Sequence, residues 1–210
     1  MARSIPRPTI ERLPLYLRCL ARLKSTGVDV VSSEDLGRLL AITSVQIRKD
    51  LAYFGEFGRR GIGYDVDSLA HQVTSILGAD QPQRIALVGL GHLGQALANY
   101  EGFREHGFNI AVMFDADPSK VGLTVAGQRI LPVDRMSDVV KHTGIELAVL
   151  AVPAHAAQRI ADVLVQAGVR ALWNFAPVRL SVPEHVEVRY ENLIIGLLAL
   201  SYYLKENKGR

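Results

Sequence analysis

Residues 84–100 read RIALVGLGHLGQALANY, an apolar run followed by a glycine-rich turn and a segment of helical composition. Gly89, Gly91 and Gly94 have the GxGxxG spacing that lets a strand, a tight turn and a helix hold a pyrophosphate against the backbone. Asp115 ends the next apolar run, 21 residues after Gly94. An acidic side chain there accepts hydrogen bonds from the adenosine ribose and repels a 2′-phosphate. The stretch therefore predicts a Rossmann-type site for NAD(H) rather than NADP(H).

Short β-rich runs alternate with helical segments from this motif towards the C-terminus. Strands are expected at Arg84–Val88, Phe108–Phe114, Ile145–Val152, Arg170–Asn174 and Val186–Tyr190, and helices from near His92, Pro132 and Ala154. Such alternation is typical of a parallel sheet with helices on both faces. We therefore expect an α/β protein in which residues 81–190 form a Rossmann NAD(H)-binding domain.

Ligands of open α/β sheets bind beyond the carboxyl ends of the strands. We accordingly expect the loop residues His92 and Leu93, and the strand-end residues Val152, Pro153 and Phe175, to line the cofactor crevice. These segments are poor in catalytic groups, and the chain has no evident Ser-His-Asp constellation or paired carboxylates. The sequence therefore predicts no catalytic residue.

Two short helices precede the sheet domain, within residues 1–80. The segment SEDLGRLLA begins at Ser33 behind a polar cap, and SVQIRKDLAYF begins at Thr43 or Ser44. The second helix has an apolar stripe of Ile47, Leu51 and Phe54. Its other faces carry the residues that we expect to contact DNA, as the second helix of a helix-turn-helix does in a major groove: Ser44, Gln46, Arg48 and Lys49.

The segment GEFGRRGIGYDV follows this helix directly. Its glycines flank Arg59 and Arg60, and we expect a tight β-hairpin tip that presents both guanidinium groups to an adjacent minor groove. Helix, turn, basic helix and basic wing thus occupy one continuous span. That order predicts a winged-helix DNA-binding domain over residues 1–80.

Composition agrees with a nucleic-acid partner and with a reducing compartment. Residues 1–64 hold eleven Lys or Arg against six Asp or Glu, whereas the remainder holds thirteen against fifteen. A basic segment gains affinity for phosphates by releasing counterions, although a solvated basic face has the same composition. Cys19 is the single cysteine, so no internal disulfide or cysteine-based zinc site is expected. We expect no metal site, no membrane span and a cytoplasmic location.

The segment from Leu193 to Leu204 is apolar nearly all round. A helix of this kind is stable only when it is buried on most sides. We therefore expect residues 191–210 to form a C-terminal dimerisation helix that packs against, or inserts between, the domains of a partner subunit. Burial against its own Rossmann domain is the alternative.

The chain resembles the redox-sensing Rex transcriptional repressors of bacteria. The resemblance covers nearly the whole chain and is most specific in six segments: VSSEDLGRLL, QIRKDLAYFGEFGRRGIGYDV, GLGHLGQALANY, FDADPSKVG, AVPAHAAQ and WNFAPV. It implies a homodimer that binds a palindromic operator when NADH is scarce and leaves it when NADH accumulates. It also implies that NADH binds tightly and NAD+ more weakly.

The same resemblance assigns roles to individual residues. Arg48, Lys49, Arg59 and Arg60 look like the family's DNA-contacting positions, and Gly89, Gly91, Gly94 and Asp115 look like its cofactor-binding positions. Tyr100, expected on the helix after the glycine loop, is similar to the tyrosine that the family places near the nicotinamide. Arg18 looks like the family's interdomain arginine. Asn192 stands where the family commonly has an Asp that interacts with that tyrosine in the dimer.

Two other functions fit parts of this pattern. An NAD-dependent dehydrogenase with a helical N-terminal extension would use His155 or His92 as acid or base, and would convert NADH with substrate. A nucleotide-binding scaffold whose winged helix binds protein would show no salt-dependent affinity for DNA. The paired arginines of the wing argue against the scaffold. Sensing itself has a simple source, because an apolar crevice disfavours the extra positive charge of the oxidised nicotinamide.

Overall fold

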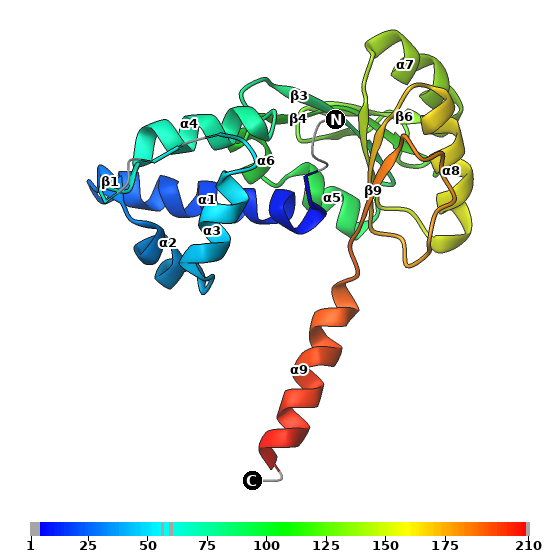
Figure 1. The fold of residues 1–210 in the computed structure, drawn as a ribbon. Coiled ribbons are helices and arrows are strands. Elements are labelled where there is room, and N and C mark those ends of the chain that lie inside the picture. The colour runs from blue at the N-terminus through cyan, green and yellow to red at the C-terminus, as the bar shows by residue number, and fades with distance from the viewer. Residues whose placement is uncertain (1–4, 56, 59–60, 209–210) are drawn as a thin grey trace. The chain divides into compact units, whose positions relative to one another are not determined.

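The computed structural model describes residues 5–55, 57–58 and 61–208, and the chain divides between Gln81 and Pro82 into two compact units (Figure 1). The first unit is mainly helical. Its elements are α1 (Arg7–Ser25), β1 (Val30–Val31), α2 (Ser33–Leu40), α3 (Ser44–Leu51), β2 (Tyr64–Asp65) and α4 (Val66–Ile76).

Side-chain caps fix where three of these helices begin. The Ser32 hydroxyl accepts a hydrogen bond from the Asp35 N–H at 3.0 Å, and the Thr43 hydroxyl accepts one from the Gln46 N–H at 3.2 Å. The Asp65 carboxylate accepts one from a backbone N–H at the start of α4 in the same way. Each cap satisfies a donor that the first helical turn leaves unpaired. The polar caps predicted for α2 and α3 are therefore confirmed.

The α2 and α3 helices form a helix-turn-helix over a shared apolar core. A Cβ added to Gly37 would lie 2.5 Å from the Ile42 carbonyl oxygen, so the close approach of the turn to α2 needs a glycine there. The largest fully buried side chains of this core come from all four helices: Leu13, Tyr16, Leu20, Leu36, Ile47 and Leu69. Burial of each large apolar side chain contributes about 1.5 to 3 kcal/mol.

Helix α3 is shorter than its apolar stripe predicts. We expected it to continue to Phe54, but α3 ends at Leu51. The Phe54 N–H donates to the Leu51 carbonyl at 2.9 Å, which tightens the chain into a turn, and Gly55 follows with a φ of +135°. Phe54 still packs on the core, half-buried, from that turn.

The strand after the wing segment has a distant partner. Tyr64–Asp65 pairs antiparallel with Val30–Val31, and the hairpin predicted just before it includes residues outside the described part of the chain, so it stays a prediction. A Cβ on Gly63 would lie 2.6 Å from the Val31 carbonyl oxygen, which explains a glycine at this crossing. Arg59 and Arg60 lie outside the described residues.

The second unit is built on a seven-stranded sheet in the order β5-β6-β4-β3-β7-β8-β9. The strands are β3 (Gln83–Val88), β4 (Phe108–Asp115), β5 (Thr124–Val125), β6 (Gln128–Pro132), β7 (Leu147–Leu150), β8 (Ala171–Asn174) and β9 (Glu187–Tyr190). All neighbours are parallel except β5, which pairs antiparallel with β6. The parallel six follow the order 3-2-1-4-5-6 of a dinucleotide-binding fold.

Helices cover both faces of this sheet, as predicted. They are α5 (His92–Ala98), α6 (Gly102–Glu105), the 3-10 helix η1 (Val133–Arg135), α7 (Met136–Thr143) and α8 (Ala154–Gln166). Alternate residues of β3 point to opposite faces, as a pleated strand requires. Ile85 and Leu87 pack in the cluster that contains residues of α5 and α6, whereas Ala86 and Val88 pack in the cluster of α7 and α8.

The helix expected from near Pro132 begins later. Pro132 ends β6 in extended conformation, pairs in register with Asp115, and precedes the single turn of η1 before α7 begins at Met136. The strands β5 and β6 were not predicted, because the hairpin between them is short. The five strands that the sequence predicted are present as β3, β4, β7, β8 and β9.

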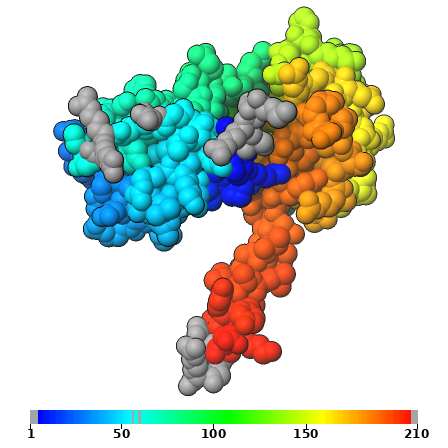
Figure 2. All heavy atoms as spheres, in the orientation of Figure 1, coloured from blue at the N-terminus to red at the C-terminus, as the bar shows by residue number. Residues whose placement is uncertain are grey.

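The last element is α9 (Leu193–Lys208), and residues 193–206 of this helix are exposed (Figure 2). Nine large apolar side chains of this helix are each at least 54% exposed: Leu193, Ile194, Ile195, Leu197, Leu198, Leu200, Tyr202, Tyr203 and Leu204. None of the three apolar clusters of the described residues includes a residue of α9. The chain therefore presents an unburied apolar helix.

Candidate functional site

The turn between β3 and α5 contains three glycines. Two of them lie too close to neighbouring atoms for a side chain, and the third faces open space. Gly89 has a φ of +93°, and an added Cβ would lie 2.5 Å from the Ala151 carbonyl oxygen. A Cβ on Gly94 would overlap the Gly89 carbonyl oxygen, so helix and strand could not pack as closely. Gly91 has no atom within 4 Å of an added Cβ. Protein atoms therefore crowd Gly89 and Gly94, whereas the space beside Gly91 is empty. This arrangement fits a pyrophosphate that approaches the backbone at Gly91.

A cleft of about 630 Å³ opens at the carboxyl ends of β3, β4 and β7. This volume lies in the usual range of ligand clefts, about 300 to 1,000 Å³. Seven of the residues predicted for the cofactor line it: Gly89, Gly91, His92, Leu93, Asp115, Val152 and Pro153. Gly94 is buried behind the turn. His155, the other histidine considered as an acid or base, also lines the cleft and is exposed.

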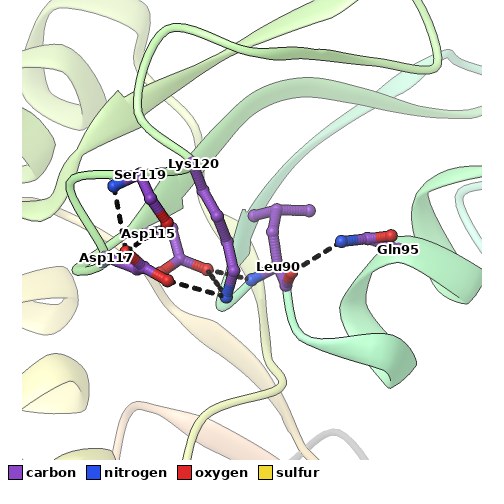
Figure 3. A network of polar contacts seen from close by, with 6 residues as sticks. All are labelled: Leu90, Gln95, Asp115, Asp117, Ser119 and Lys120. Carbon is purple, nitrogen blue, oxygen red and sulfur yellow. Dashed lines mark hydrogen bonds and ion pairs between the residues drawn. The ribbon is translucent and has the colours of Figure 1, made fainter.

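Asp115 holds the glycine loop in addition to facing the cleft (Figure 3). It is 7% exposed, and its Oδ2 atom accepts a hydrogen bond from the Leu90 N–H at 2.6 Å. Its Oδ1 atom accepts one from the Asp117 N–H at 2.8 Å. A carboxylate offers about four acceptor positions, so these two contacts leave limited capacity for ribose hydroxyls. Asp115 therefore has a structural role that the sequence pattern did not predict.

Lys120 adds a positive charge to this corner of the cleft. Its Nζ atom lies 3.4 Å from Asp115 Oδ2 and 3.7 Å from Asp117 Oδ2 (Figure 3). The backbone and hydroxyl of Ser119 also donate to Asp117, and these hydrogen bonds lower the pKa of the Asp117 carboxyl. Lys120 and Asp117 were not among the predicted site residues. A cation five residues after a motif aspartate, in FDADPSK, is the signal in the sequence that could have indicated them.

Phe175 lies away from the residues that line the cleft. Its ring lies tilted against Trp173 with centroids 4.6 Å apart, and Trp173 meets Phe103 edge-on at 6.0 Å. Phe103 in turn meets Tyr100 edge-on at 5.1 Å. Tyr100 is 61% exposed and follows the end of α5 at Ala98, so it is not part of the helix in which we expected it.

The residues of α3 that are predicted to contact DNA differ in how far their side chains are exposed. Arg48 and Lys49 are exposed, and the Arg48 guanidinium donates to the Ser33 hydroxyl at 2.8 Å. Ser44, the first residue of α3, is half-buried. The Gln46 side-chain amide, by contrast, donates to Asp50 Oδ1 at 2.8 Å. Gln46 is half-buried, and its role in DNA contact stays a prediction.

A groove of about 710 Å³ lies beside these helices within the first unit. It is lined by the start of α2, the exposed side of α3 and the glycine-rich segment after it, including Ser32, Ser33, Arg48, Phe57, Ile62 and Tyr64. Arg48 therefore stands at the border between the groove and the exposed surface of α3.

Asp50 is the acceptor for a buried network that the sequence analysis missed. Its side chain is fully buried and accepts hydrogen bonds from Thr9 at 3.0 Å, Tyr16 at 2.5 Å and Gln46 at 2.8 Å. Arg12 donates through two nitrogens, Nε to Oδ2 at 2.6 Å and Nη2 to Oδ1 at 2.7 Å. Burial alone would raise the pKa of Asp50, but the hydrogen bonds of the four donor side chains outweigh it and lower the pKa to about 2. Asp50 is therefore ionised at neutral pH.

Two residues assigned to switching are both exposed. Arg18 lies on α1, and Asn192 immediately precedes α9. The Asn192 side-chain oxygen accepts a hydrogen bond from the Ile194 N–H at 3.1 Å, so this residue caps the first turn of α9.

The described part of the chain shows neither a metal site nor a membrane-spanning helix. No group of three or more His, Cys, Asp or Glu side chains there has a metal-binding arrangement. Among the same residues, no helix combines the length and apolarity that a bilayer span requires.

Comparison with known proteins identifies relatives over nearly the whole chain. A family model described as a CoA binding domain matches residues 80–178, and a model of DNA-binding protein N-termini matches residues 4–52. The redox-sensing transcriptional repressor Rex of Chloroflexus aggregans is 50% identical over 199 residues, which cover 95% of this chain and 94% of that protein. The protein of the same name from Roseiflexus sp. is 48% identical over 95% of this chain and 90% of its own length.

Solved structures show the same likeness. The repressor RSP in complex with β-NAD+ and operator DNA matches with a TM-score of 0.93 and 38% identity, over 98% of this chain and 94% of that chain. RSP in complex with β-NADH matches with a TM-score of 0.89 and 37% identity, over 97% of this chain and 96% of that chain.

Proposed function

The chain belongs to the Rex family of redox-sensing transcriptional repressors, and from that premise we propose that NADH releases it from a palindromic operator that it binds as a homodimer. The observation that carries the proposal is the presence of both binding elements in one chain. The second unit has a glycine-lined cleft with Asp115 at its edge, and the first has a helix-turn-helix with exposed Arg48 and Lys49. One of the two RSP complexes contains NAD+ together with operator DNA, and the other contains NADH.

The cleft supports a preference for NADH over NAD+. Its lining is largely apolar beyond the glycine turn, with Val133, Val152, Pro153 and Ile160 among the contributing residues. Transfer of an unpaired positive charge into such surroundings is costly, so the neutral reduced nicotinamide should bind more tightly. NADH is thus the tight ligand in this account, and NAD+ the weaker one.

The cofactor is proposed to be NAD(H) although the family model is described by coenzyme A. Both molecules contain an adenosine diphosphate group, and the glycine turn suits the pyrophosphate of either. The crevice in a sheet of 3-2-1-4-5-6 order is the usual place of a dinucleotide. Coenzyme A is therefore the natural competitor to include as a control.

Homodimer formation is proposed from the apolar surface of α9. Nine large apolar side chains, each more than half exposed, exceed what single surface residues explain. A second copy of the chain would cover them in a two-fold interface, in which each buried side chain contributes about 1.5 to 3 kcal/mol. This is the role that we propose for residues 191–210.

The dimer also supplies the switch. A two-fold pair of recognition helices reads half-sites about 34 Å apart, or a multiple of that spacing. NADH needs only to stabilise an arrangement of the two subunits in which that spacing or the tilt of the helices is wrong. Arg18, Tyr100 and Asn192 are proposed to take part in this change, and the amide of Asn192 would do so without the charge of an aspartate.

Regulation of transcription, rather than catalysis, is the proposed activity. The relatives are named as repressors, and we propose a cytoplasmic repressor without turnover of the cofactor. A dehydrogenase would oxidise or reduce the nicotinamide during incubation with substrate, which absorbance at the NADH band would reveal. Repression requires only binding.

The proposal is tested with DNA selected by the protein itself. Duplexes are enriched from a random-sequence pool with wild-type protein and no nucleotide, and the enriched sequence is called the selected duplex. Anisotropy then measures its affinity at one salt concentration, because phosphate contacts make affinity depend on salt. We expect NADH to weaken binding, NAD+ to do so less, and coenzyme A to have no effect. Equal affinity with saturating NADH and without nucleotide would refute the proposed switch.

A further inference from the structure

The proposed recognition helix, α3, contains a charged side chain that is buried inside its own unit. Asp50 lies between the exposed Lys49 and the buried Leu51, and its carboxylate is fully buried. A carboxylate removed from water is costly unless it is paired and hydrogen-bonded. Here both oxygens are satisfied, and the donors come mostly from another helix.

The donors on α1 lie along a single face of that helix. Thr9, Arg12 and Tyr16 are spaced at i, i+3 and i+7, so their side chains share one side of α1 over two turns. Each of them donates to the same carboxylate on α3. The fourth donor, Gln46, stands one turn before Asp50 on α3 itself. One carboxylate thus joins two turns of α1 to the last turn of α3.

We propose that Asp50 is a positioning residue for operator reading, which fixes the rotation and axial placement of α3 against α1. Gln46 acts by holding Asp50 rather than by reading a base. The inference rests on the proposed function, because a recognition helix that reads no DNA needs no such precision.

The geometry explains why hydrogen bonds are used at this place. Apolar contacts such as those of Ile47 and Leu51 resist separation of two helices, but they tolerate small slides and rotations. A forked guanidinium–carboxylate pair has fixed directions and distances. Buried ion pairs contribute little net stability relative to apolar replacements, so fixing one arrangement is the better-attested use. Arg48 and Lys49 project from the same short helix, and any rotation of α3 moves both.

Three variants separate positioning from stability. Asp50→Asn keeps the shape of the side chain and removes its charge. Gln46→Met keeps the length of the side chain and removes the amide, while the Arg12–Asp50 pair remains. A third variant, called the apolar variant, combines Thr9→Val, Arg12→Met, Tyr16→Phe and Asp50→Leu. It replaces the buried pair and its two buried hydroxyl donors by apolar groups, a change that is often neutral or stabilising. Arg84→Met, an exposed arginine of the second unit, is the matched control.

Each variant is measured against the selected duplex and against a scrambled duplex of the same composition, at one salt concentration. Affinity for the scrambled duplex depends on charge, which Arg48 and Lys49 retain. We expect the ratio of selected to scrambled affinity to fall about tenfold in the three variants, the effect of losing about one good base contact. NADH affinity should stay at the wild-type value. The apolar variant should unfold at a temperature near that of wild type and still show the reduced ratio, which loss of stability alone would not produce.

Duplexes with single base-pair changes decide the role of Gln46. If Gln46 braces Asp50, the Gln46→Met variant loses discrimination at every position of the half-site together. Loss at one base pair only would show that Gln46 reads that base, and an unchanged affinity ratio in all three variants would overturn the positioning role of Asp50. If wild-type protein itself fails to distinguish the two duplexes, the proposed function fails, and the positioning role falls with it.

Discussion

Arg12 and Asp50 meet through two parallel hydrogen bonds, from Nε to Oδ2 at 2.6 Å and from Nη2 to Oδ1 at 2.7 Å, across 38 residues of chain. The Asp50 side chain is fully buried, whereas the Arg12 side chain is 24% exposed. Helix α1 is thereby hydrogen-bonded to the proposed recognition helix, α3, through the buried carboxylate of Asp50. Both the stability of the first unit and the placement of its DNA-reading residues are linked to this pair.

Acid should weaken the first unit in a defined range of pH. The pKa of Asp50 is lowered from 3.8 to about 2, so its ionised form stabilises the folded state. That contribution is fully present above about pH 4, and it is lost as the pH falls through 2, to a total of about 2 kcal/mol. Thermal unfolding of wild type between pH 5 and pH 2, followed by circular dichroism, measures the loss.

The Asp50→Asn variant is the control for this acid effect. It should be less stable than wild type at pH 7, because Arg12 then lacks a charged partner, and its stability should change less between pH 4 and pH 2. Parallel curves for wild type and Asp50→Asn over that range would show that another group accounts for the acid sensitivity.

Two similar substitutions in the glycine loop should differ in their effect on stability. Gly94→Ala should lower the unfolding temperature and abolish NADH binding, because the new Cβ would overlap the Gly89 carbonyl oxygen. Gly91→Ala should leave the unfolding temperature unchanged, since the added Cβ meets no atom within 4 Å, yet it should weaken NADH binding at least about tenfold by blocking the pyrophosphate. Nucleotide fluorescence and differential scanning fluorimetry distinguish the two effects. Full NADH affinity in Gly91→Ala would place the pyrophosphate elsewhere.

Lys120 should govern tolerance of a 2′-phosphate. Its ammonium offsets Asp115 and Asp117 at 3.4 and 3.7 Å, and the Lys120→Met variant leaves both carboxylates without that cation. We expect NADPH affinity to fall about fivefold more than NADH affinity, which corresponds to roughly 1 kcal/mol for a partly exposed charge pair. Competition titrations against bound NADH give the ratio. Lys141→Met on α7 is the matched control, and equal losses for both nucleotides in Lys120→Met would exclude this role.

The exposed helix α9 should control assembly. Ile195→Asp places a charge in the proposed interface, where the wild-type side chain is 63% exposed in the single chain. A two-fold dimer contains the change twice, so its dissociation constant should rise about 100-fold or more. Sedimentation velocity at micromolar concentration should show a monomer. The Lys205→Asp variant, on the same helix, should remain dimeric, and an unchanged sedimentation coefficient for Ile195→Asp would contradict the assignment.

The sheet unit was largely predictable because its signals are local. Gly89 and Gly94 answer steric requirements within a single strand-turn-helix, and alternating apolar runs marked five of its strands. The contacts of Asp115 were less accessible to sequence reasoning. Its bonds to the Leu90 N–H and to Lys120 depend on how the turn after β4 folds back on the glycine loop. The contact of Phe175 with Trp173, which keeps Phe175 out of the cleft lining, likewise depends on packing between strand ends.

The first unit was less predictable because its decisive contacts are distant in sequence. Asp50 pairs with residues 34 to 41 positions away, and Tyr64–Asp65 pairs with Val30–Val31. The sequence does contain one local signal of the buried network. Asp50 stands next to Leu51 and three residues after Ile47, on the buried stripe of an amphipathic helix, where a charge is rare unless it is paired.

The central claim is that reduced cofactor and operator prefer different arrangements of the same protein. Calorimetric titration of NADH into wild-type protein, alone and saturated with the selected duplex, tests it most directly. Because coupling is reciprocal, the duplex should weaken NADH binding by the same factor by which NADH weakens duplex binding. Identical NADH affinities with and without the duplex would show that the two ligands do not share one equilibrium, and the account would be wrong.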